Sequence, residues 1–180
     1  MEKGYLYAFT AMMAFMVNLN LLAQSLPTDN DTKKITYQET VIIDSVTRDV
    51  LYERCKYWIA NYYKTDKYDV DDKANFKVLK EGFFIVKLTY DIKYKAEHNV
   101  TYTVSFHLKD GKYRITITDF TIYNVSTGPK TKQSLEVALS KMSSQNKTEL
   151  TAQVNKEVNN IIEDIKKVMK KGAVEDKDDW

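Results

Sequence analysis

The sequence is poor in side chains that could perform catalysis or hold a metal. It contains two histidines, His98 and His107, and one cysteine, Cys55. Zinc sites use closely spaced ligands, as in the H-E-x-x-H pattern, and neither histidine has such a partner in the sequence. A cysteine nucleophile needs exposure and a neighbouring base, whereas Cys55 shares a helical face with Trp58. We therefore expect no metal and no cofactor, and we assign no catalytic residue.

Other motifs with a chemical mechanism are also missing. The sequence has no G-x-S-x-G, G-x-x-x-x-G-K-[ST] or G-x-G-x-x-G pattern. It therefore contains none of these motifs of serine hydrolases, nucleotide hydrolases and dinucleotide-binding enzymes. The sequence has an acidic cluster that suggests a calcium site: Asp69, Asp71 and Asp72. Because the cluster lacks the glycine and the distant glutamate of an EF-hand loop, we expect a solvated acidic loop instead.

The first part of the domain is predicted to be a strand followed by a helix. Apolar and polar residues alternate over 35–43, with Glu39 as the exception on the apolar side. Thr47 or Ser45 can cap the helix that follows. The apolar positions of this helix recur at spacings of three and four: Leu51, Cys55, Trp58, Ile59 and Tyr62. The spacing predicts that Cys55 is buried.

Alternating residues then predict four strands. We expect strands at 76–80, 84–94, 100–108 and 113–122, a polar surface connection at 63–75, and a polar loop at 95–99 that includes His98. Glu81-Gly82 is expected to form a turn. Asp110-Gly111 predicts a hairpin with a type I′ turn, which needs positive φ at both central residues. The change of parity at Asp119 indicates a β-bulge.

Two further helices follow the break at Gly128-Pro129. We expect a short helix at 134–142, a polar join, and a long amphipathic helix from Leu150 to Lys171 that ends at Gly172. The element order is β-α-β-β-β-β-α. One-sided strands and amphipathic helices predict an α+β fold, in which helices cover one face of an antiparallel sheet and water wets the other.

The wet sheet face is the one extended polar surface that the sequence predicts. The candidate binding residues on it are Lys87, Thr89, Thr103, His107, Arg114 and Thr116. Threonine is also a good strand former, so a solvated face without a ligand is the simpler interpretation. A second alternative is an enzyme of the hydrolase type, with a site assembled from His107, Arg114 and Asp91 on neighbouring strands.

The beginning of the chain has the pattern of a secretory signal peptide. Lys3 precedes an apolar run from Tyr5 to Val17 that is too short to span a bilayer, and Ala23 offers a cleavage position. We expect a signal peptide at 1–23, a linker at 24–34, a single domain at 35–171 and an acidic, disordered tail at 172–180. The exported product is expected in the periplasm or outside the cell, without a transmembrane segment.

Composition narrows the class of partner. Lys and Arg number 27, and Asp and Glu number 25, which gives a net charge of +2. Removal of the first 23 residues takes away one acid and one base, Glu2 and Lys3, and leaves this balance unchanged. We expect no nucleic-acid partner, because a near-neutral chain lacks the charge that drives such binding. One cysteine cannot form an internal disulfide, so the fold depends on its core.

Two stretches of the sequence resemble a known family. They are ITYQETVIIDSVTRDVLYERCKYWIANYY, which begins at Ile35, and KDGKYRITITDF, which begins at Lys109. The likeness covers Ile35 to Tyr123 and is to exported Bacteroidetes proteins catalogued as a domain of unknown function with a TBP-like fold. The resemblance implies a TBP-like β-α-β4-α domain without an assigned activity. That family often has a glycine turn at the position of Ser45.

One short motif concerns modification. Asp44-Ser45-Val46 resembles the O-glycosylation motif of exported Bacteroidetes proteins, so Ser45 is a candidate glycosylation site. With no catalytic motif and one extended polar face, we expect an exported, non-enzymatic domain that binds a protein, peptide or glycan in the cell envelope.

Overall fold

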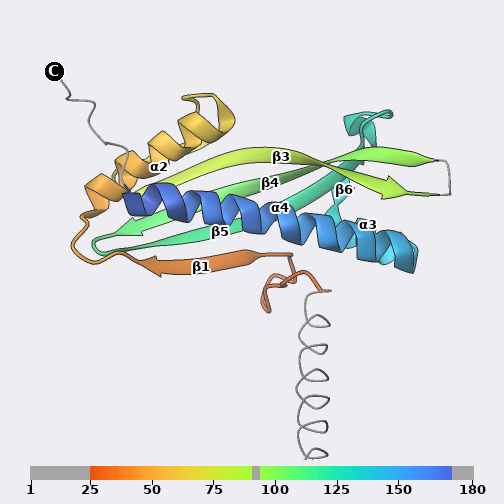
Figure 1. Ribbon diagram of the computed structural model, residues 1–180, viewed down its shortest axis with the longest axis horizontal. Helices are drawn as coiled ribbons and strands as arrows, with labels where there is room; N and C mark the ends of the chain where they lie inside the picture. The colour runs from red at the N-terminus through yellow and green to blue at the C-terminus, as the bar shows by residue number, and fades with distance from the viewer. Residues whose placement is uncertain (1–24, 91–93, 172–180) are drawn as a thin grey trace, which may run out of the picture.

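A computed structural model describes residues 25–90 and 94–171, which form a sheet with helices packed on it (Figure 1). The first elements are β1 (Tyr37–Ile42), α2 (Arg48–Tyr63) and β2 (Val70–Asp72). The long strands are β3 (Lys77–Thr89), β4 (Lys95–Lys109) and β5 (Lys112–Asn124). A 3-10 turn η3 (Pro129–Thr131), β6 (Gln133–Ser134), α3 (Leu135–Lys141) and α4 (Ser144–Lys171) follow. The predicted α+β class is confirmed.

The sheet is antiparallel, with the strand order β1-β5-β4-β3-β2. β3, β4 and β5 are neighbours both in the chain and in the sheet. β1 comes first in the chain but pairs with one end of β5, and β6 pairs with the other end. The turn after β1 therefore meets the β4–β5 hairpin, where the N–H of Ile43 donates to the Gly111 carbonyl at 2.8 Å.

α2 and α4 lie over the same face of the sheet (Figure 1). The α2 residues predicted to be buried are in the core, with Leu51, Cys55, Trp58 and Ile59 at most 1 % exposed. Tyr62 is the exception at 42 %, because it stacks on Trp58 at the rim of the core, with ring centroids 5.0 Å apart. The opposite, outward face of the sheet is covered by no described helix.

Polar contacts tie the helix layer together and to the sheet. The indole N–H of Trp58 donates to Asp164 of α4 at 2.9 Å. Arg54 donates to the carbonyl of Met169, near the end of α4, at 2.7 Å. Glu39, the polar exception on the inward side of β1, forms an ion pair with Lys166 at 2.8 Å. These contacts fix α4 against α2 and β1.

The local turns follow the sequence signals in part. Thr47 caps α2 and accepts from the N–H of Val50 at 3.4 Å. Asp119 adopts φ 55° where the β4–β5 register shifts, so the predicted bulge is confirmed. The predicted hairpin is present, but the type I′ turn is wrong, because only Gly111 has positive φ. The side chain of Asp110 instead accepts from the N–H of Arg48 at 2.8 Å, at the start of α2.

The turn predicted at Glu81-Gly82 is wrong, because β3 runs unbroken from Lys77 to Thr89. The strands expected at 76–80 and 84–94 are therefore one strand. Gly82 makes room for two aromatic rings: a Cβ there would lie 2.6 Å from Tyr63 Cε1 and 2.7 Å from Tyr102 Cζ. The two hydroxyls of these tyrosines lie 2.9 Å apart. This glycine thus marks a close approach of side chains to the strand.

Three other boundaries differ from the prediction. Residues 95–99, expected as a loop, begin β4 and pair with residues 85–89. Residues 70–72, expected within a surface connection, form the edge strand β2. The polar join expected before residue 150 belongs to α4, which begins at Ser144. Residues 91–93, part of an expected strand, lie outside the described residues.

The segment before β1 packs against the domain. Leu26 contacts the core, and Thr28 forms an isolated antiparallel bridge with Ile35. The expected signal peptide, 1–23, and the expected tail, 172–180, lie outside the described residues. Among the described helices, none is long and apolar enough to cross a membrane.

Candidate functional site

The outward face of the sheet consists of rows of side chains that lie side by side across the strands. One row, from β3 to β1, holds Lys77, His107, Arg114 and Thr40. The next rows toward the middle of the sheet hold Leu79, Ser105 and Thr116, then Glu81, Thr103 and Thr118, then Phe83, Thr101 and Thr121. Four of the predicted binding residues, Thr103, His107, Arg114 and Thr116, therefore lie on neighbouring rows of one surface.

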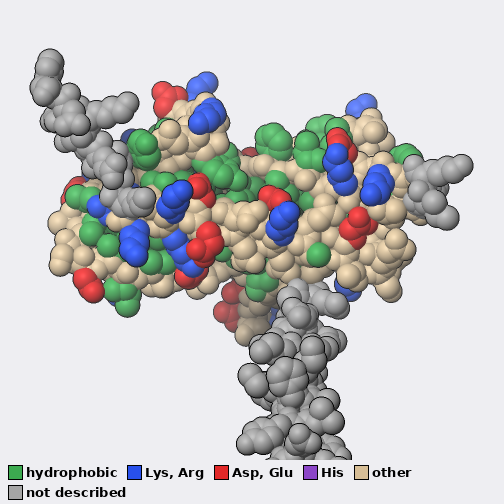
Figure 2. Space-filling view, viewed as in Figure 1, with side chains coloured by type: hydrophobic (Ala, Val, Ile, Leu, Met, Phe, Trp, Pro, Cys, Tyr) green, Lys and Arg blue, Asp and Glu red, His purple; other side chains and the backbone are tan. Residues whose placement is uncertain are grey.

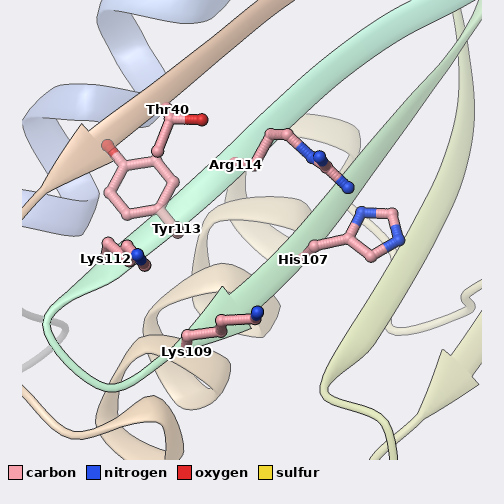
Figure 3. Close-up of a pocket in the computed structure, with 6 residues that line it drawn as sticks. All are labelled: Thr40, His107, Lys109, Lys112, Tyr113 and Arg114. Atoms are coloured by element: carbon pink, nitrogen blue, oxygen red, sulfur yellow. The ribbon is translucent and has the colours of Figure 1, made fainter.

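A shallow cavity of about 450 Å³ lies at the row of His107 and Arg114. Its lining residues are Thr40, His107, Lys109, Lys112, Tyr113 and Arg114 (Figure 3). Figure 3 shows His107 and Arg114 next to each other on β4 and β5, with Lys109 and Lys112 near the ends of the same strands. The lining is basic and includes no carboxylate, so we name it the cationic pocket.

His107 is the histidine of the cationic pocket, and histidine is the side chain whose charge ordinarily changes between pH 5 and 8. Burial, and then the positive charges of Arg114 and Lys77, hold the pKa of His107 below its ordinary value. Its Nδ1 atom is buried and has no hydrogen-bond partner among the described residues. The ring is therefore disposed to be neutral in the free protein.

The lysine and arginine side chains of the pocket have no acidic partner in the part of the chain that the structure describes. Lys109, Lys112 and Arg114 form no ion pair with any described residue. Figure 2, which shows the helix layer, has Lys and Arg mixed with Asp and Glu over that face. The cationic pocket differs from that mixed surface because its positive charges are gathered without compensation.

Lys87 and Thr89 do not lie at the cationic pocket. Lys87 pairs with Glu97 on β4, and the ten residues from Glu97 to His107 span about 33 Å of strand. Lys87 forms an ion pair with Glu97 at 3.1 Å, and Thr89 is hydrogen-bonded to Glu149 of α4. The predicted set is therefore split between two ends of the sheet.

An apolar part of the outward face was missed by the sequence analysis. Phe83 and Ile85 of β3 are 62 % and 49 % exposed. The row of Ile85 continues through Asn99 to Tyr123. The signal in the sequence is the apolar run at 83–86 directly after Gly82, because four consecutive apolar residues place apolar side chains on both faces of a strand. Glu81, Phe83 and Ile85 all take the outward parity once the strand is unbroken.

The remaining chemical candidates have structural partners. His98, expected in a loop, is a β4 residue that is 7 % exposed, and its Nε2 lies 3.1 Å from the hydroxyl of Tyr90. Burial lowers the pKa of His98. Cys55 is buried, as predicted, and burial raises the pKa of its thiol.

The acidic cluster likewise serves the fold. Asp71 accepts from the hydroxyl of Tyr52 and from Lys56, and Asp69 accepts from the N–H of Glu81 at 2.5 Å. No three His, Cys, Asp or Glu side chains of the described residues are grouped so that they could hold a metal ion.

Ser45 lies in the exposed turn between β1 and α2, near the β4–β5 hairpin. It adopts φ 65°, in the left-handed region that favours glycine. Glycine, which the resemblance leads us to expect at this turn, would adopt this geometry without the steric cost of a Cβ. Glycosylation of Ser45 stays a prediction.

Comparison with known proteins identifies the fold. Residues 37–123 match the family model described as "Domain of unknown function (DUF4468) with TBP-like fold". Over these residues the chain is similar to the DUF4468 family. The resemblance seen in the sequence is thereby confirmed, and the DUF4468 description assigns no activity. No curated protein matches the chain.

Two solved structures resemble this chain. A TBP-like protein from Parabacteroides distasonis has a TM-score of 0.62 and 16 % identity, and the likeness covers 82 % of this chain and 98 % of that one. A DUF4468 family protein from Bacteroides ovatus has a TM-score of 0.60 and 9 % identity, with 80 % of this chain and 90 % of that one covered. At such identities the likeness shows the fold alone.

Proposed function

We propose that this protein is exported and is a non-enzymatic binding module of the cell envelope. Its ligand is a protein, peptide or glycan that places an anionic group, such as a carboxylate, sulfate or phosphate, in the cationic pocket. Thr103 and Thr116, on the adjoining rows, offer hydroxyl groups to the rest of the ligand.

The observation that carries the proposal is the set of uncompensated cations. Lys109, Lys112 and Arg114 surround one cavity and have no acidic partner among the described residues. Like charges gathered around one cavity repel one another, so an anion bound among them is favoured. The planar fork of a guanidinium such as Arg114 suits two-point binding of an oxyanion.

His107 makes the proposed binding depend on pH. A bound anion stabilises the charged imidazolium, whereas Arg114 and Lys77 disfavour it in the free protein. Ligand binding therefore raises the pKa of His107. By linkage, affinity increases as the pH falls through the pKa values of the free and bound forms.

A hydrolase centred on His107 is the alternative. General acid–base catalysis of hydrolysis commonly pairs histidine with a carboxylate or an activated nucleophile. The cationic pocket contains no carboxylate, and Asp91, the acid considered for this role, lies outside the described residues. The open, basic lining favours binding over catalysis.

Export rests on the sequence of the first 23 residues, and the periplasm or the extracellular space is the proposed location. Intact-mass measurement of the protein from its native host tests this part. Loss of about 23 residues supports export, and recovery of the chain with Met1 in place contradicts it. An added mass that disappears in Ser45→Ala would show that Ser45 carries the modification.

Binding is tested by comparing two double variants that each remove two positive charges. Lys112→Ala with Arg114→Ala changes the cationic pocket, whereas Lys156→Ala with Lys167→Ala changes exposed positions of α4. Substitutions at such positions usually alter stability by under about 0.5 kcal/mol. Each variant and the wild type are used at equal folded concentration to capture partners from the host envelope. We expect the pocket variant alone to lose the partner; equal recovery with both variants contradicts the proposal.

A further inference from the structure

The outer edge of β3 carries backbone groups that are only partly paired. Alternate residues of β3 direct their N–H and C=O groups toward β4, and the others direct theirs toward the opposite edge. β2 pairs with this edge only at residues 77–79. Beyond β2, side chains take the place of a neighbouring strand.

Those side chains cover the edge on both sides of a gap. Asp69 accepts from the N–H of Glu81 at 2.5 Å. Gln153 of α4 binds both backbone groups of Lys87, accepting from its N–H at 2.9 Å and donating to its carbonyl at 2.8 Å. Glu149 accepts from the N–H of Thr89 at 2.9 Å. The edge is thus closed at Glu81 and again from Lys87 onward.

Phe83 and Ile85 lie between these two covered positions. Their N–H and C=O groups face the edge, and none has a hydrogen-bond partner among the described residues. Their side chains are more exposed than most large apolar residues of the domain. Figure 2 shows hydrophobic side chains along the upper margin of the molecule, where β3 forms the edge of the sheet in Figure 1. The gap therefore combines free backbone groups with an apolar surface.

We propose that the β3 edge from Glu81 to Lys87 binds a short, extended peptide segment as an added antiparallel strand. The inference does not depend on the cationic pocket. Free N–H and C=O groups at alternate residues of a strand are satisfied by another extended backbone, and such strand addition is a recurrent mode of peptide recognition.

The surroundings specify the chemistry of this peptide. Phe83 and Ile85 require apolar residues at the two positions directly opposite them, because cross-strand side chains on one face are in contact. Glu81 is exposed and forms no ion pair with a described residue, so a basic side chain at the end of the segment, within reach of the Glu81 carboxylate, is favoured. The distance from Glu81 to Lys87 is about 20 Å of strand, which limits the segment to about five residues.

A second copy of this domain fits the gap less well. An edge-to-edge dimer would bring a whole β3 strand of the other copy against this one. Asp69 and β2 already occupy the edge next to residues 77–81, where such a long strand would have to continue. A short segment that leaves the edge at both ends avoids these groups.

The test uses the pentapeptide acetyl-Val-Thr-Val-Thr-Lys-amide with the isotopically labelled protein. In the antiparallel register its two valines lie opposite Ile85 and Phe83, and its C-terminal lysine leaves the edge before Asp69 and directs its ammonium group toward the side chain of Glu81. We expect saturable amide shifts centred on Phe83 and Ile85, and hydrogen exchange of these two amides slowed by about tenfold at saturation.

Two N-methylated peptides provide the matched control. Methylation of both valine nitrogens removes the donors that face β3, and methylation of both threonine nitrogens removes donors that face away. We expect only the valine-methylated peptide to lose binding. Equal binding of both methylated peptides, or shifts located elsewhere, overturns the proposal.

Protein variants give a second readout. Ile85→Pro removes an N–H from the edge without removing a bond to β4, and edge strands accept proline. We expect Ile85→Pro to abolish peptide binding and Ile85→Thr, which keeps the N–H, to retain it. If Ile85→Pro does not fold, the comparison of the two methylated peptides still tests the proposal. Self-association that protects Phe83 and Ile85 without peptide also overturns the proposal, because the occupant would then be a second copy.

Discussion

His107 and Arg114 occupy directly opposed positions of the β4–β5 ladder, and both side chains stand on the outward face beside the same cavity. Two cations at opposed positions destabilise a sheet. Because Arg114 is always charged, the histidine is the partner whose charge state can change.

The first prediction concerns the pKa of His107. Arg114→Gln removes one of the two positive charges that lower this pKa, so we expect the pKa to rise in the variant. It should stay below 6.5, because burial is the larger cause and is unchanged. NMR titration of the ring measures the shift. The pKa of His98 is the internal control and should not move; an unchanged pKa for His107 contradicts the electrostatic explanation.

The same pKa predicts how stability depends on pH. His107 has a lower pKa in the folded state than in the unfolded chain, so the unfolded chain takes up the proton first as the pH falls. The stability contributed by neutral His107 is present above the unfolded pKa of about 6.5 and is lost as the pH falls toward the folded pKa. Arg114→Gln should reduce this loss, measured by urea unfolding at several pH values.

Gly82 should not tolerate a methyl group. In Gly82→Ala the new Cβ would lie 2.6 Å from Tyr63 and 2.7 Å from Tyr102, so we expect a loss of about 2–3 kcal/mol in the free energy of unfolding. In the Tyr63→Ala background one of the two close neighbours is gone, and the loss should be smaller. Equal losses in both backgrounds would show that the tyrosine ring does not restrict this position.

Cys55 should behave as a core residue. It is fully buried in α2, so a bulky thiol reagent should label the native protein only as fast as the protein opens. Cys55→Ala should lower the free energy of unfolding by about 1–2 kcal/mol through lost packing. Rapid labelling under native conditions would contradict the burial of this thiol.

Ser45 should gain stability from replacement by glycine. Its φ of 65° costs an L-residue about 1–2 kcal/mol, whereas glycine adds about 0.5–1 kcal/mol of backbone entropy cost. We therefore expect Ser45→Gly to be more stable by about 0.5 kcal/mol. Ser45→Val is the matched control and should be less stable, since β-branched residues disfavour this conformation. Chemical denaturation measures both; a destabilised glycine variant contradicts the strain.

The spacing of apolar residues predicted most of the helices and strands and the buried face of each, because the apolar side chains of an element face the core. Leu51, Cys55 and Trp58 are buried as their spacing indicates, and the bulge at Asp119 follows from its change of parity. Periodicity cannot tell why a glycine lies within a strand. The sequence predicts a turn at Gly82, whereas the glycine is needed there because the ring of Tyr63 lies against the strand. Tyr63 belongs to α2, so this contact cannot be seen in the local sequence.

The candidate site was predictable only in part, for the same reason. Strand parity placed His107 and Arg114 on the outward face, but their shared cavity depends on the pairing of β4 with β5 and of β5 with β1. Lys87 has the same parity and lies at the far end of the sheet. The distance along a strand is visible in the sequence, whereas the order β1-β5-β4-β3-β2 is set by tertiary contacts.

Titration of the labelled protein with sulfate, while His107 and the pocket amides are followed by NMR, tests the central claim most directly. Chloride at matched ionic strength is the control for general screening. We expect sulfate to cause saturable shifts at Thr40, Lys112 and Arg114, to raise the pKa of His107, and to bind more tightly at lower pH. Shifts that are equal with chloride, or that spread over the exposed lysines of α4 without saturation, would contradict an anion site in the cationic pocket.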